Sequence, residues 1–578
     1  DTDGVHPKPS RPVPGSTGVN FVGPGVTNGG RSSRTASQGY IRKESAMHFN
    51  VRTNTAILIL LSCAYFFLFL PPNLTGAKDS NMLSIFQIDE YAQYPHVMKM
   101  TSLGTSLLGT LHNFVGYGHY YYGYPFFLTS ATAILPLRFA FKFFGDSADP
   151  TMAYMSVLRQ LSSLFMVMAI NILVYMWTGF KSLWKSVFLF LFLASIPAVF
   201  DNNMWWHPDS LVTLFVVLTI FSLHKDNLEY GIWFYMASMF CGLATGTKLV
   251  GFWFFLAIAI YLALGLKRIG LKPLLRHAVF FFVIMFLAIV VSNPLLLIPR
   301  TAKSIIDIQI SQVKVIGLGW GVQMTKDPLA WYTGTLRHGF GFWWVYIIVL
   351  GACSWGIRFD NDKRLLNIIT LAWFVPFSLY LLFFVALKSA RYFLPALLPM
   401  MSCIGNQAMW NISCRGPKQI MTFVFTSILL LLLGLQLVFN VQADINSYLH
   451  VLHREQESLS LEFYHQLDKT YFQKVPQGVR LTVFRDPYVY VPPLKNVDVR
   501  MKWGSADYRD IGRLKPDLIL LQRDYVTTYS NPSIVNVSLK PEQAEESLIF
   551  YRDAKNNTIK GYHRILETPF GFSFERNK

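Results

Sequence analysis

Long apolar runs alternate with short polar connections along most of the chain. The first run covers residues 55–70 and is followed by Pro71-Pro72. An apolar run of about 20 residues can cross the hydrocarbon core of a bilayer as an α-helix. The pattern therefore predicts a mostly α-helical, multi-pass membrane protein with about eleven transmembrane helices plus juxtamembrane helices. The other predicted spans lie near 155–177, 183–200, 210–223, 231–244, 250–266, 279–298, 340–357, 365–387, 392–412 and 420–441.

One further apolar run, 125–137, is too short to be counted among the spans. It contains Pro136 and ends at Arg138. With about 13 residues it falls short of the length that crosses a bilayer, so we expect a juxtamembrane helix at the membrane interface. This assignment decides on which side of the membrane each later connection between spans lies.

Basic residues test the resulting topology. With 125–137 excluded from the spans, compact basic connections such as those with Lys181, Lys267 and Arg268 fall on one side of the membrane. Short loops rich in Lys and Arg are typical of the cytoplasmic side. We therefore expect a cytoplasmic N-terminus, and an active site and C-terminal domain on the extracytoplasmic or lumenal side.

The same pattern divides the chain into three parts. Residues 1–46 are rich in Gly, Ser, Pro and Thr and are expected to be a disordered leader or tail. Residues 47–441 form the transmembrane domain, whose first extracytoplasmic loop is 71–154. Residues 442–578 are polar, with strand-like segments at 480–484, 497–503 and 517–521 and a helical segment at 459–471. They predict a small extracytoplasmic α/β domain.

Composition and charge agree with a membrane protein. The chain is 52% hydrophobic and 15% charged, which argues against a soluble enzyme. Its formal net charge of +18 comes mostly from Lys and Arg in the connections between apolar runs. Such residues anchor spans on the cytoplasmic side, so no nucleic-acid partner is expected.

Two adjacent acids, Asp89 and Glu90, follow the first predicted span. Acids in such a loop are usually solvent-exposed. A carboxylate with a function here would act as a general base and remove the proton from an attacking hydroxyl group. Asp89 is the candidate base, and Glu90 would orient it, bind the acceptor substrate or face water.

Three cations, Lys248, Lys388 and Arg391, lie at span boundaries. Each one alone is explained by a side chain that reaches from the apolar layer to the interface. Together on one rim and beside an acid, they predict a site for the phosphate of a lipid.

Further polar candidates lie in two segments. In the first, Asp209 follows His207 and Pro208 and is expected to cap the next helix, to bind substrate hydroxyls, or to share a divalent cation with His207. A required cofactor is not predicted. The second is the long connection 300–339, whose Arg337 and His338 are candidate acceptor contacts, because such loops often act as lids.

These segments, in their order along 47–441, resemble the C-type (GT-C) membrane glycosyltransferases. The resemblance is to the branch of the protein O-mannosyltransferases and the lipid A aminoarabinose transferase. It rests on Asp89-Glu90 after the first span, Tyr124-Pro125, Pro208-Asp209, the run 242–248 that ends in Lys248, and Lys388 with Arg391-Tyr392-Phe-Leu-Pro395. The chain departs from the family where it has Tyr-Gly-Tyr-Pro in place of a frequent double proline.

The resemblance implies a glycosyltransferase that takes a sugar from a dolichyl- or undecaprenyl-type polyprenyl phosphate. The acceptor, which is a protein, a glycolipid or a glycan, would be modified at the extracytoplasmic face with inversion at the anomeric carbon. By this resemblance Asp89 matches the catalytic acid of the first loop. Lys248, Lys388 and Arg391 match cations near the donor phosphate.

An alternative function is a transporter or flippase of a lipid-linked sugar. Transporters place ionisable residues near the middle of the bilayer and are often built from repeated halves. The chain shows no internal repeat, and its acids and cations are predicted at one rim, which favours the transferase.

Overall fold

The computed structural model describes residues 51–144, 149–319, 322–324, 326–406, 417–476 and 478–577. The predicted leader 1–46 lies outside these residues. The chain divides into two compact units, 1–53 and 54–578, and the fold and the site described below belong to the second.

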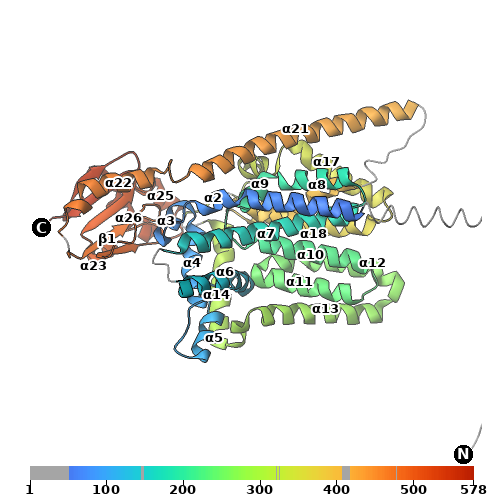
Figure 1. Cartoon of the computed structure of the whole chain (residues 1–578), viewed down its shortest axis with the longest axis horizontal. Coiled ribbons are helices and arrows are strands. Elements are labelled where there is room, and N and C mark those ends of the chain that lie inside the picture. The colour runs from blue at the N-terminus through green and yellow to red at the C-terminus, as the bar shows by residue number, and fades with distance from the viewer. Residues whose placement is uncertain are drawn as a thin grey trace, which may run out of the picture. The chain divides into compact units, whose positions relative to one another are not determined.

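A bundle of apolar helices forms most of this unit. Helices α10 (Asp209–Asp226), α11 (Ile232–Thr247) and α13 (Leu271–Ser292) lie side by side (Figure 1). In the described part of the chain, seven helices are long and apolar enough to cross a membrane, or eight if a pair of segments bent by 76° is counted as one span. The seven are Val51–Leu74, Tyr124–Phe143, Thr151–Thr178, Leu249–Ile269, Leu271–Ser292, Arg364–Phe384 and Thr426–His453, and the bent pair is Pro328–Phe340 with Trp343–Phe359.

Other predicted spans form shorter apolar helices that pack inside the bundle. The run 183–200 is divided at Pro197 into two helices, because proline favours the first turn of a new helix. The shorter helices are α8 (Leu183–Ala194), α9 (Pro197–Asn202), α10 (Asp209–Asp226), α11 (Ile232–Thr247) and α19 (Leu394–Met401). Residues 407–412 of the predicted span 392–412 lie outside the described residues. The predicted fold class, a helical multi-pass membrane protein with a small C-terminal domain, is confirmed, although several predicted spans are shorter than a bilayer.

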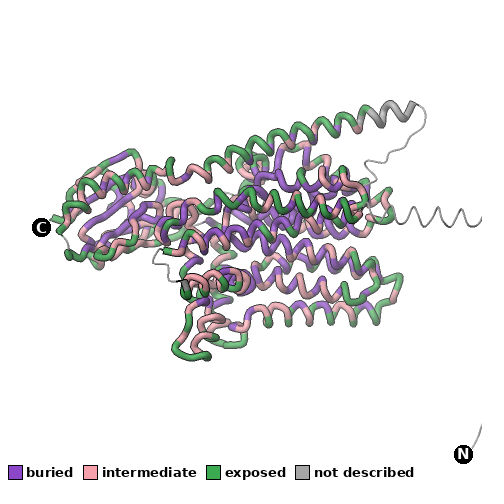
Figure 2. The backbone as a smooth tube through the Cα atoms, in the orientation of Figure 1, coloured by how far each residue is buried: buried purple, intermediate pink, exposed green. Residues whose placement is uncertain are grey.

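Large side chains fill the centre of the bundle. Trp373 of α18 (Arg364–Phe384) stacks on Phe254 of α12 (Phe254–Ile269), with ring centroids 4.1 Å apart. Its Nε1 donates to the carbonyl of Pro395, at 2.9 Å. Figure 2 shows the buried residues of the bundle concentrated in its inner helices. This packing holds the connection between α18 and α19, which carries Arg391.

The run 125–137 belongs to α6 (Tyr124–Phe144), which is longer than predicted. The segment is long and apolar enough to cross a membrane, so the length argument against a span is wrong. Its two ends nevertheless contact the same loop: Tyr124 Oη donates to the carbonyl of Phe114, and Arg138 Nη1 donates to that of Met98. These contacts tie both ends of α6 to the segment 98–114.

The first loop contains three short helices before α6: α3 (Ser80–Phe86), α4 (Ile88–Met100) and α5 (Leu107–Val115). The side chain of Asp79 caps α3 by accepting from the backbone N–H groups of Asn81 and Met82. Helix α4 begins directly before Asp89 and Glu90, where the positive end of the helix dipole favours acids.

The C-terminal domain is built around a five-stranded sheet in the order β2-β1-β3-β5-β4. β1 (Leu481–Arg485) pairs in parallel with β2 (Val497–Met501) and β3 (Leu518–Gln522), with Leu481 opposite Val497. β5 (Gly571–Arg576) pairs antiparallel with β3 and with β4 (Tyr562–Glu567). The predicted strands correspond to β1, β2 and β3, whereas the sequence pattern did not reveal β4 and β5.

Helices cover both faces of this sheet. They are α22 (Leu459–Thr470), α23 (Tyr508–Leu514), α24 (Arg523–Tyr529), α25 (Ser533–Val537) and α26 (Pro541–Asn556). The predicted domain boundary at residue 442 falls inside α21 (Pro417–His453), because this helix continues beyond the apolar run.

The domain docks on the first loop through hydrogen bonds. Tyr490 Oη donates to Asp79 Oδ2 at 2.6 Å, and Asn81 Nδ2 donates to the carbonyl of Val491 at 3.0 Å. The buried Arg485 donates to Ser84 Oγ at 2.9 Å. Trp503 of the domain also packs on Tyr91 of α4, and Glu90 of α4 pairs with Arg159 of the bundle, so the helix that carries Asp89 is held between the bundle and the C-terminal domain.

Candidate active site

A pocket of about 910 Å³ lies where the bundle, the first loop and the C-terminal domain meet. Its polar part on the side of the bundle is lined by Asp89, Tyr121, Tyr122, Asp209, Lys248, Arg391 and Tyr392. Helix α14 (Pro299–Leu318) forms another wall, where Gln309 Nε2 donates to the carbonyl of Tyr120 at 2.6 Å. A pocket of this size is typical of sites that bind small molecules.

Each charged residue of this pocket lies at the end of a helix or at a break between helices. Asp89 lies in the first turn of α4, and Asp209 begins α10 directly after Pro208. Lys248 follows the last residue of α11, and Arg391 lies in the short helix η4 (Ala390–Phe393) before α19. The breaks bring residues that are distant in sequence to one place.

Two acids and two cations form a connected ion-pair network. Lys248 Nζ lies 2.6 Å from Asp209 Oδ1, and Arg391 Nη1 lies 3.1 Å from Asp89 Oδ2. Arg391 Nε is also 3.9 Å from Asp209 Oδ2. The Asp89 side chain is 33% exposed, whereas that of Asp209 is 2% exposed. Asp89 is therefore the carboxylate that a bound substrate can reach.

Aromatic rings hold the two cations in place. The Arg391 guanidinium lies 4.2 Å from the ring centroid of Trp205, and Lys248 Nζ lies 4.8 Å from that of Tyr392. Such cation–π contacts stabilise a positive charge that is partly removed from water. They keep both cations beside the pocket.

His207 connects Asp209 to Tyr122. Its Nδ1 lies 2.6 Å from Asp209 Oδ2, and its Nε2 lies 2.7 Å from Tyr122 Oη. Burial lowers the pKa of His207 to about 4, although the Asp209 carboxylate opposes this shift. The imidazole is therefore neutral at physiological pH. The short distance between Nδ1 and Asp209 favours the tautomer with its proton on Nδ1, in which Nε2 accepts a hydrogen bond from the Tyr122 hydroxyl.

The surroundings of Asp209 do not fit a divalent cation shared with His207. Asp209 Oδ1 already accepts from Lys248, and Oδ2 faces the Nδ1 of His207. In the residues that the structure describes, no group of three or more His, Cys, Asp or Glu side chains could hold a metal ion. Two cationic side chains and a protonated ring nitrogen leave this carboxylate without a place for a metal.

Glu90 lies next to Asp89 in sequence but points away from the pocket. It is fully buried, and its Oε2 lies 2.6 Å from Nη2 of the equally buried Arg159. Its Oε1 accepts from the backbone N–H of Trp206 at 2.9 Å. The expectation that Glu90 contacts the acceptor does not agree with this position, because the carboxylate is inaccessible and already paired.

Four other expected site residues also lie outside the set that lines the pocket: Lys388, Arg337, His338, and His207, which contacts the lining residues Asp209 and Tyr122. Lys388 is half-buried, and its Nζ donates to the carbonyl of Ala386 at 3.4 Å. Arg337 and His338 are exposed in α16 (Arg337–Phe340), where the Arg337 guanidinium lies over the ring of Phe342. The structure thus groups Asp89, His207, Asp209, Lys248 and Arg391, whereas Lys388, Arg337 and His338 are not among the described residues that line the pocket.

Sequence reasoning missed several residues of the site. Tyr122 belongs to a Tyr-rich run that was visible in the sequence, but nothing there indicated its contact with His207. Trp205 packs on Arg391, and nothing in the local sequence indicates this contact. Tyr488 and Trp503 of the C-terminal domain line the pocket, and no local motif marks them.

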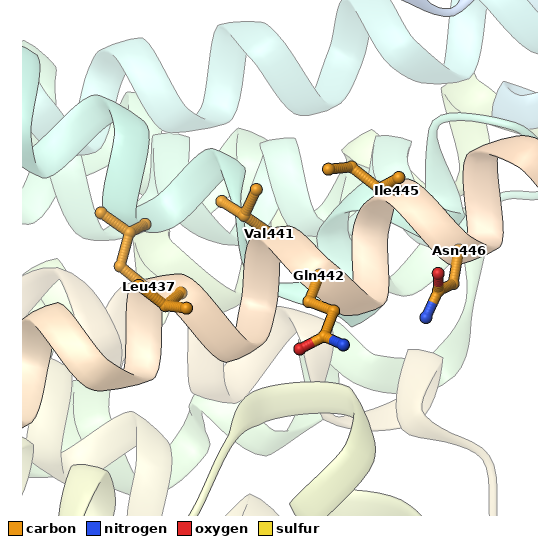
Figure 3. A pocket seen from close by; sticks show the side chains of 6 residues that line it. Leu437, Val441, Gln442, Ile445 and Asn446 are labelled. Carbon is orange, nitrogen blue, oxygen red and sulfur yellow. The ribbon is translucent and has the colours of Figure 1, made fainter.

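A second hollow lies along one face of α21, and none of the charged residues of the first pocket lines it. It is lined by Leu437, Val438, Val441, Gln442, Ile445 and Asn446 (Figure 3). Its lining contains no acid and no base. It therefore lacks groups for acid–base chemistry.

Comparison with known proteins identifies the fold. No protein-family model and no curated protein sequence matches the chain. The crystal structure of ArnT from Cupriavidus metallidurans bound to undecaprenyl phosphate is similar, with a TM-score of 0.50 and 12% sequence identity over 90% of this chain and 97% of that chain. The apo structure of ArnT has a TM-score of 0.48. For the Archaeoglobus fulgidus oligosaccharyltransferase in complex with Zn and sulfate the TM-score is 0.43, over 88% of this chain and 72% of that chain.

The similarity to ArnT with undecaprenyl phosphate extends over nearly the whole of both chains. It includes the helical bundle and the C-terminal domain, the two parts that enclose the pocket. The chain therefore shares its overall fold with ArnT, which agrees with the fold expected from the sequence resemblance.

Proposed function

We propose that the protein transfers a sugar from a polyprenyl-phosphate donor to an acceptor hydroxyl group. The observation that carries this proposal is the reachable carboxylate of Asp89 in one pocket with Lys248 and Arg391. A general base and a pair of cations are what a displacement at a sugar phosphate requires.

The donor fits the part of the pocket that faces the bundle. Beside Lys248 and Arg391, the lining is apolar and comprises Leu249, Val250, Trp253, Phe377, Tyr380 and Leu381. An apolar surface next to two cations suits a prenyl chain attached to a phosphate. The undecaprenyl phosphate bound by ArnT supports this class of donor.

Binding of a lipid phosphate would change the ion pairs of the site. The two cations are balanced by Asp89 and Asp209, so a phosphate competes with these carboxylates. Asp209 stays attached to Lys248 and His207 because it is buried. Arg391, in contrast, can turn from the more exposed Asp89 to the phosphate, which leaves Asp89 free to accept a proton.

Transfer then proceeds by a single displacement. Asp89 accepts the proton of the acceptor hydroxyl while the hydroxyl oxygen forms a bond to the anomeric carbon. The bond from this carbon to the phosphate oxygen breaks, and the phosphate leaves with the electron pair. Lys248 and Arg391 stabilise the negative charge that grows on the phosphate in the transition state. The sugar is transferred with inversion at the anomeric carbon.

His207 and Tyr122 position the other groups. Asp209 fixes the imidazole of His207, which in turn accepts from Tyr122. The Tyr122 ring lines the pocket, so this chain of contacts holds an aromatic wall beside Asp89. We place the pocket on the extracytoplasmic or lumenal side, which the distribution of basic loops supports.

A transfer assay tests the proposal. The purified full chain is reconstituted in liposomes with synthetic polyprenyl-phosphate sugars labelled in the sugar, and product and freed polyprenyl phosphate are measured together. Stoichiometric release of polyprenyl phosphate with the appearance of a glycosylated product supports a transferase. Movement of intact donor between leaflets without cleavage would instead support a transporter.

A further inference from the structure

The pocket extends from Asp89 into the C-terminal domain. The part of its lining that this domain supplies includes Pro487, Tyr488, Trp503, Gly504, Ser505, Tyr525, Tyr529, Ser538, Lys540 and Gln543. This wall contains no acid. Among its described residues Lys540 is the one cation, and the others are aromatic, hydroxyl and amide side chains together with Pro487, Gly504 and the apolar Ile534, Leu539 and Ala544.

Three tyrosine rings form a continuous row on this wall. The ring centroids of Tyr488 and Tyr525 are 6.1 Å apart, and those of Tyr525 and Tyr529 are 5.5 Å apart. Tyr525 and Tyr529 lie one turn apart on α24, so they share a face of the helix. Tyr529 stacks on the buried Tyr551, whose Oη donates to Asp486 at 2.9 Å. The row is therefore anchored in the domain core.

Trp503 connects this wall to the helix of the catalytic acid. It follows β2, is 56% exposed, and its ring centroid lies 6.0 Å from that of Tyr91 in α4. Tyr488 is also close to the acid: burial and the Asp89 carboxylate both raise the pKa of its phenol. The wall thus begins beside Asp89 and leads away from it along Tyr525 and Tyr529.

The chemistry of the wall indicates its ligand. Aromatic rings present flat apolar faces with polar edges. Within the described part of the chain, the phenol oxygens of Tyr488, Tyr525 and Tyr529 have no hydrogen-bond partner, so they are available to a ligand. A row of such rings with hydroxyl and amide groups beside it suits a neutral sugar, whose ring has an apolar face and a rim of hydroxyls.

We propose that the wall formed by Tyr488, Trp503, Tyr525 and Tyr529 binds the acceptor, and that this acceptor is a neutral glycan. This inference rests on the proposed function, since the donor phosphate occupies the cationic end of the same pocket. The terminal sugar of the glycan lies next to Tyr488 and Trp503 and presents a hydroxyl to Asp89. The following sugars stack along Tyr525 and Tyr529.

Binding of the full chain in detergent to a glycan array tests this inference without any transfer reaction. The array carries neutral, sialylated and phosphorylated glycans together with unmodified peptides. We expect neutral glycans to bind, and Trp503→Ala to weaken this binding by about tenfold or more. Trp503→Phe, which keeps a ring, should retain most of it. Ile549→Ala, a truncation of an exposed side chain on α26 outside the pocket, should bind as the wild type does.

The outcomes separate this inference from the proposed function. Asp89→Asn should bind neutral glycans normally and fail in transfer. Absence of any neutral glycan binding, equal binding by Trp503→Ala, or preference for peptides or charged glycans would overturn the glycan-binding wall. Neutral glycan binding together with absence of donor cleavage would instead leave the wall in place and contradict the transferase.

Discussion

Arg159 holds Glu90 in a buried ion pair directly beside the pocket. Arg159 Nη2 lies 2.6 Å from Glu90 Oε2, and Nε lies 2.9 Å from Oε1. Arg159 Nη1 also donates to the carbonyls of Asn73 and Thr75. Because successive residues of a helix point in different directions, Asp89 faces the pocket while Glu90 joins the first loop to α7 (Thr151–Thr178).

This relationship predicts that Glu90→Gln destabilises the protein. The variant leaves the guanidinium of Arg159 buried without its counter-charge, which costs about 3 to 5 kcal/mol for pairs of this kind. Thermal unfolding in detergent should therefore occur at a clearly lower temperature. Glu457→Gln, which removes an exposed acid with an exposed partner, is the matched control and should unfold as the wild type does. Wild-type stability of Glu90→Gln would contradict a structural role.

Lys248 should determine affinity for the donor phosphate. Replacing it with methionine removes a charge-assisted contact, so we expect binding of polyprenyl phosphate to weaken by about tenfold or more. Binding can be measured by displacement of a fluorescent polyprenyl phosphate in nanodiscs. Lys248→Arg keeps the charge and should recover part of the affinity, while Lys495→Met, at an exposed site outside the pocket, should not change it. Equal affinity in Lys248→Met and wild type would exclude this phosphate site.

Acid pH should destabilise the folded protein through His207. Its pKa is about 4 in the folded chain, whereas an unfolded histidine titrates near pH 6.5. Between these values the unfolded chain binds more protons, so stability falls as the pH drops from about 6.5 to 4. For one such group the loss is on the order of 3 kcal/mol over this range.

Unfolding temperatures measured from pH 7.5 to pH 4.5 check this pH dependence. His207→Gln should reduce the slope, since the substituted side chain does not titrate. Burial also lowers the pKa of His119 to about 4. The unfolding temperature of His207→Gln should therefore still depend on pH in part. A slope that His207→Gln leaves unchanged would show that His207 is not buried in its neutral form.

Gly123 allows the Tyr-rich loop to approach the end of α11. Its N–H donates to the carbonyl of Thr247 at 2.9 Å, and a Cβ at this position would collide with the backbone carbonyl of Gly246. Gly123→Ala should therefore push Tyr122 away from His207 and lower transfer by about tenfold or more, as small misplacements at active sites do. Gly434→Ala, where a Cβ meets nothing within 4 Å, is the control. Unchanged transfer in Gly123→Ala would show that the loop position is unimportant.

The sequence predicted the parts of the fold that depend on local pattern. Apolar runs identified the helices, and the position of Asp89 after the first run identified the accessible acid. Lys248, Arg391 and Asp209 were also predicted as candidate site residues, because charged residues at the ends of apolar runs are candidates for a function.

The parts of the fold and of the site that the sequence did not predict depend on contacts between residues that are distant in sequence. The partner of Glu90 is Arg159, an arginine inside a long apolar helix, and nothing in the local pattern of either segment connects them. Lys388 and Arg391 look equivalent in sequence, yet of the two Arg391 lines the pocket; it lies in the short helix η4, whereas Lys388 precedes this helix. The wall from the C-terminal domain lies about 400 residues from Asp89 along the chain. A local sequence motif cannot show that two segments so distant in sequence meet in one pocket.

The role of Asp89 is the centre of this account, and the rate of sugar transfer by Asp89→Asn tests it most directly. The variant keeps the shape of the side chain and removes its ability to accept a proton, so transfer from a labelled polyprenyl-phosphate sugar should fall by about 10² to 10⁴-fold. Binding of polyprenyl phosphate should persist, and Asp524→Asn, at an exposed acid outside the pocket, should transfer normally. Transfer by Asp89→Asn at the wild-type rate would contradict the account.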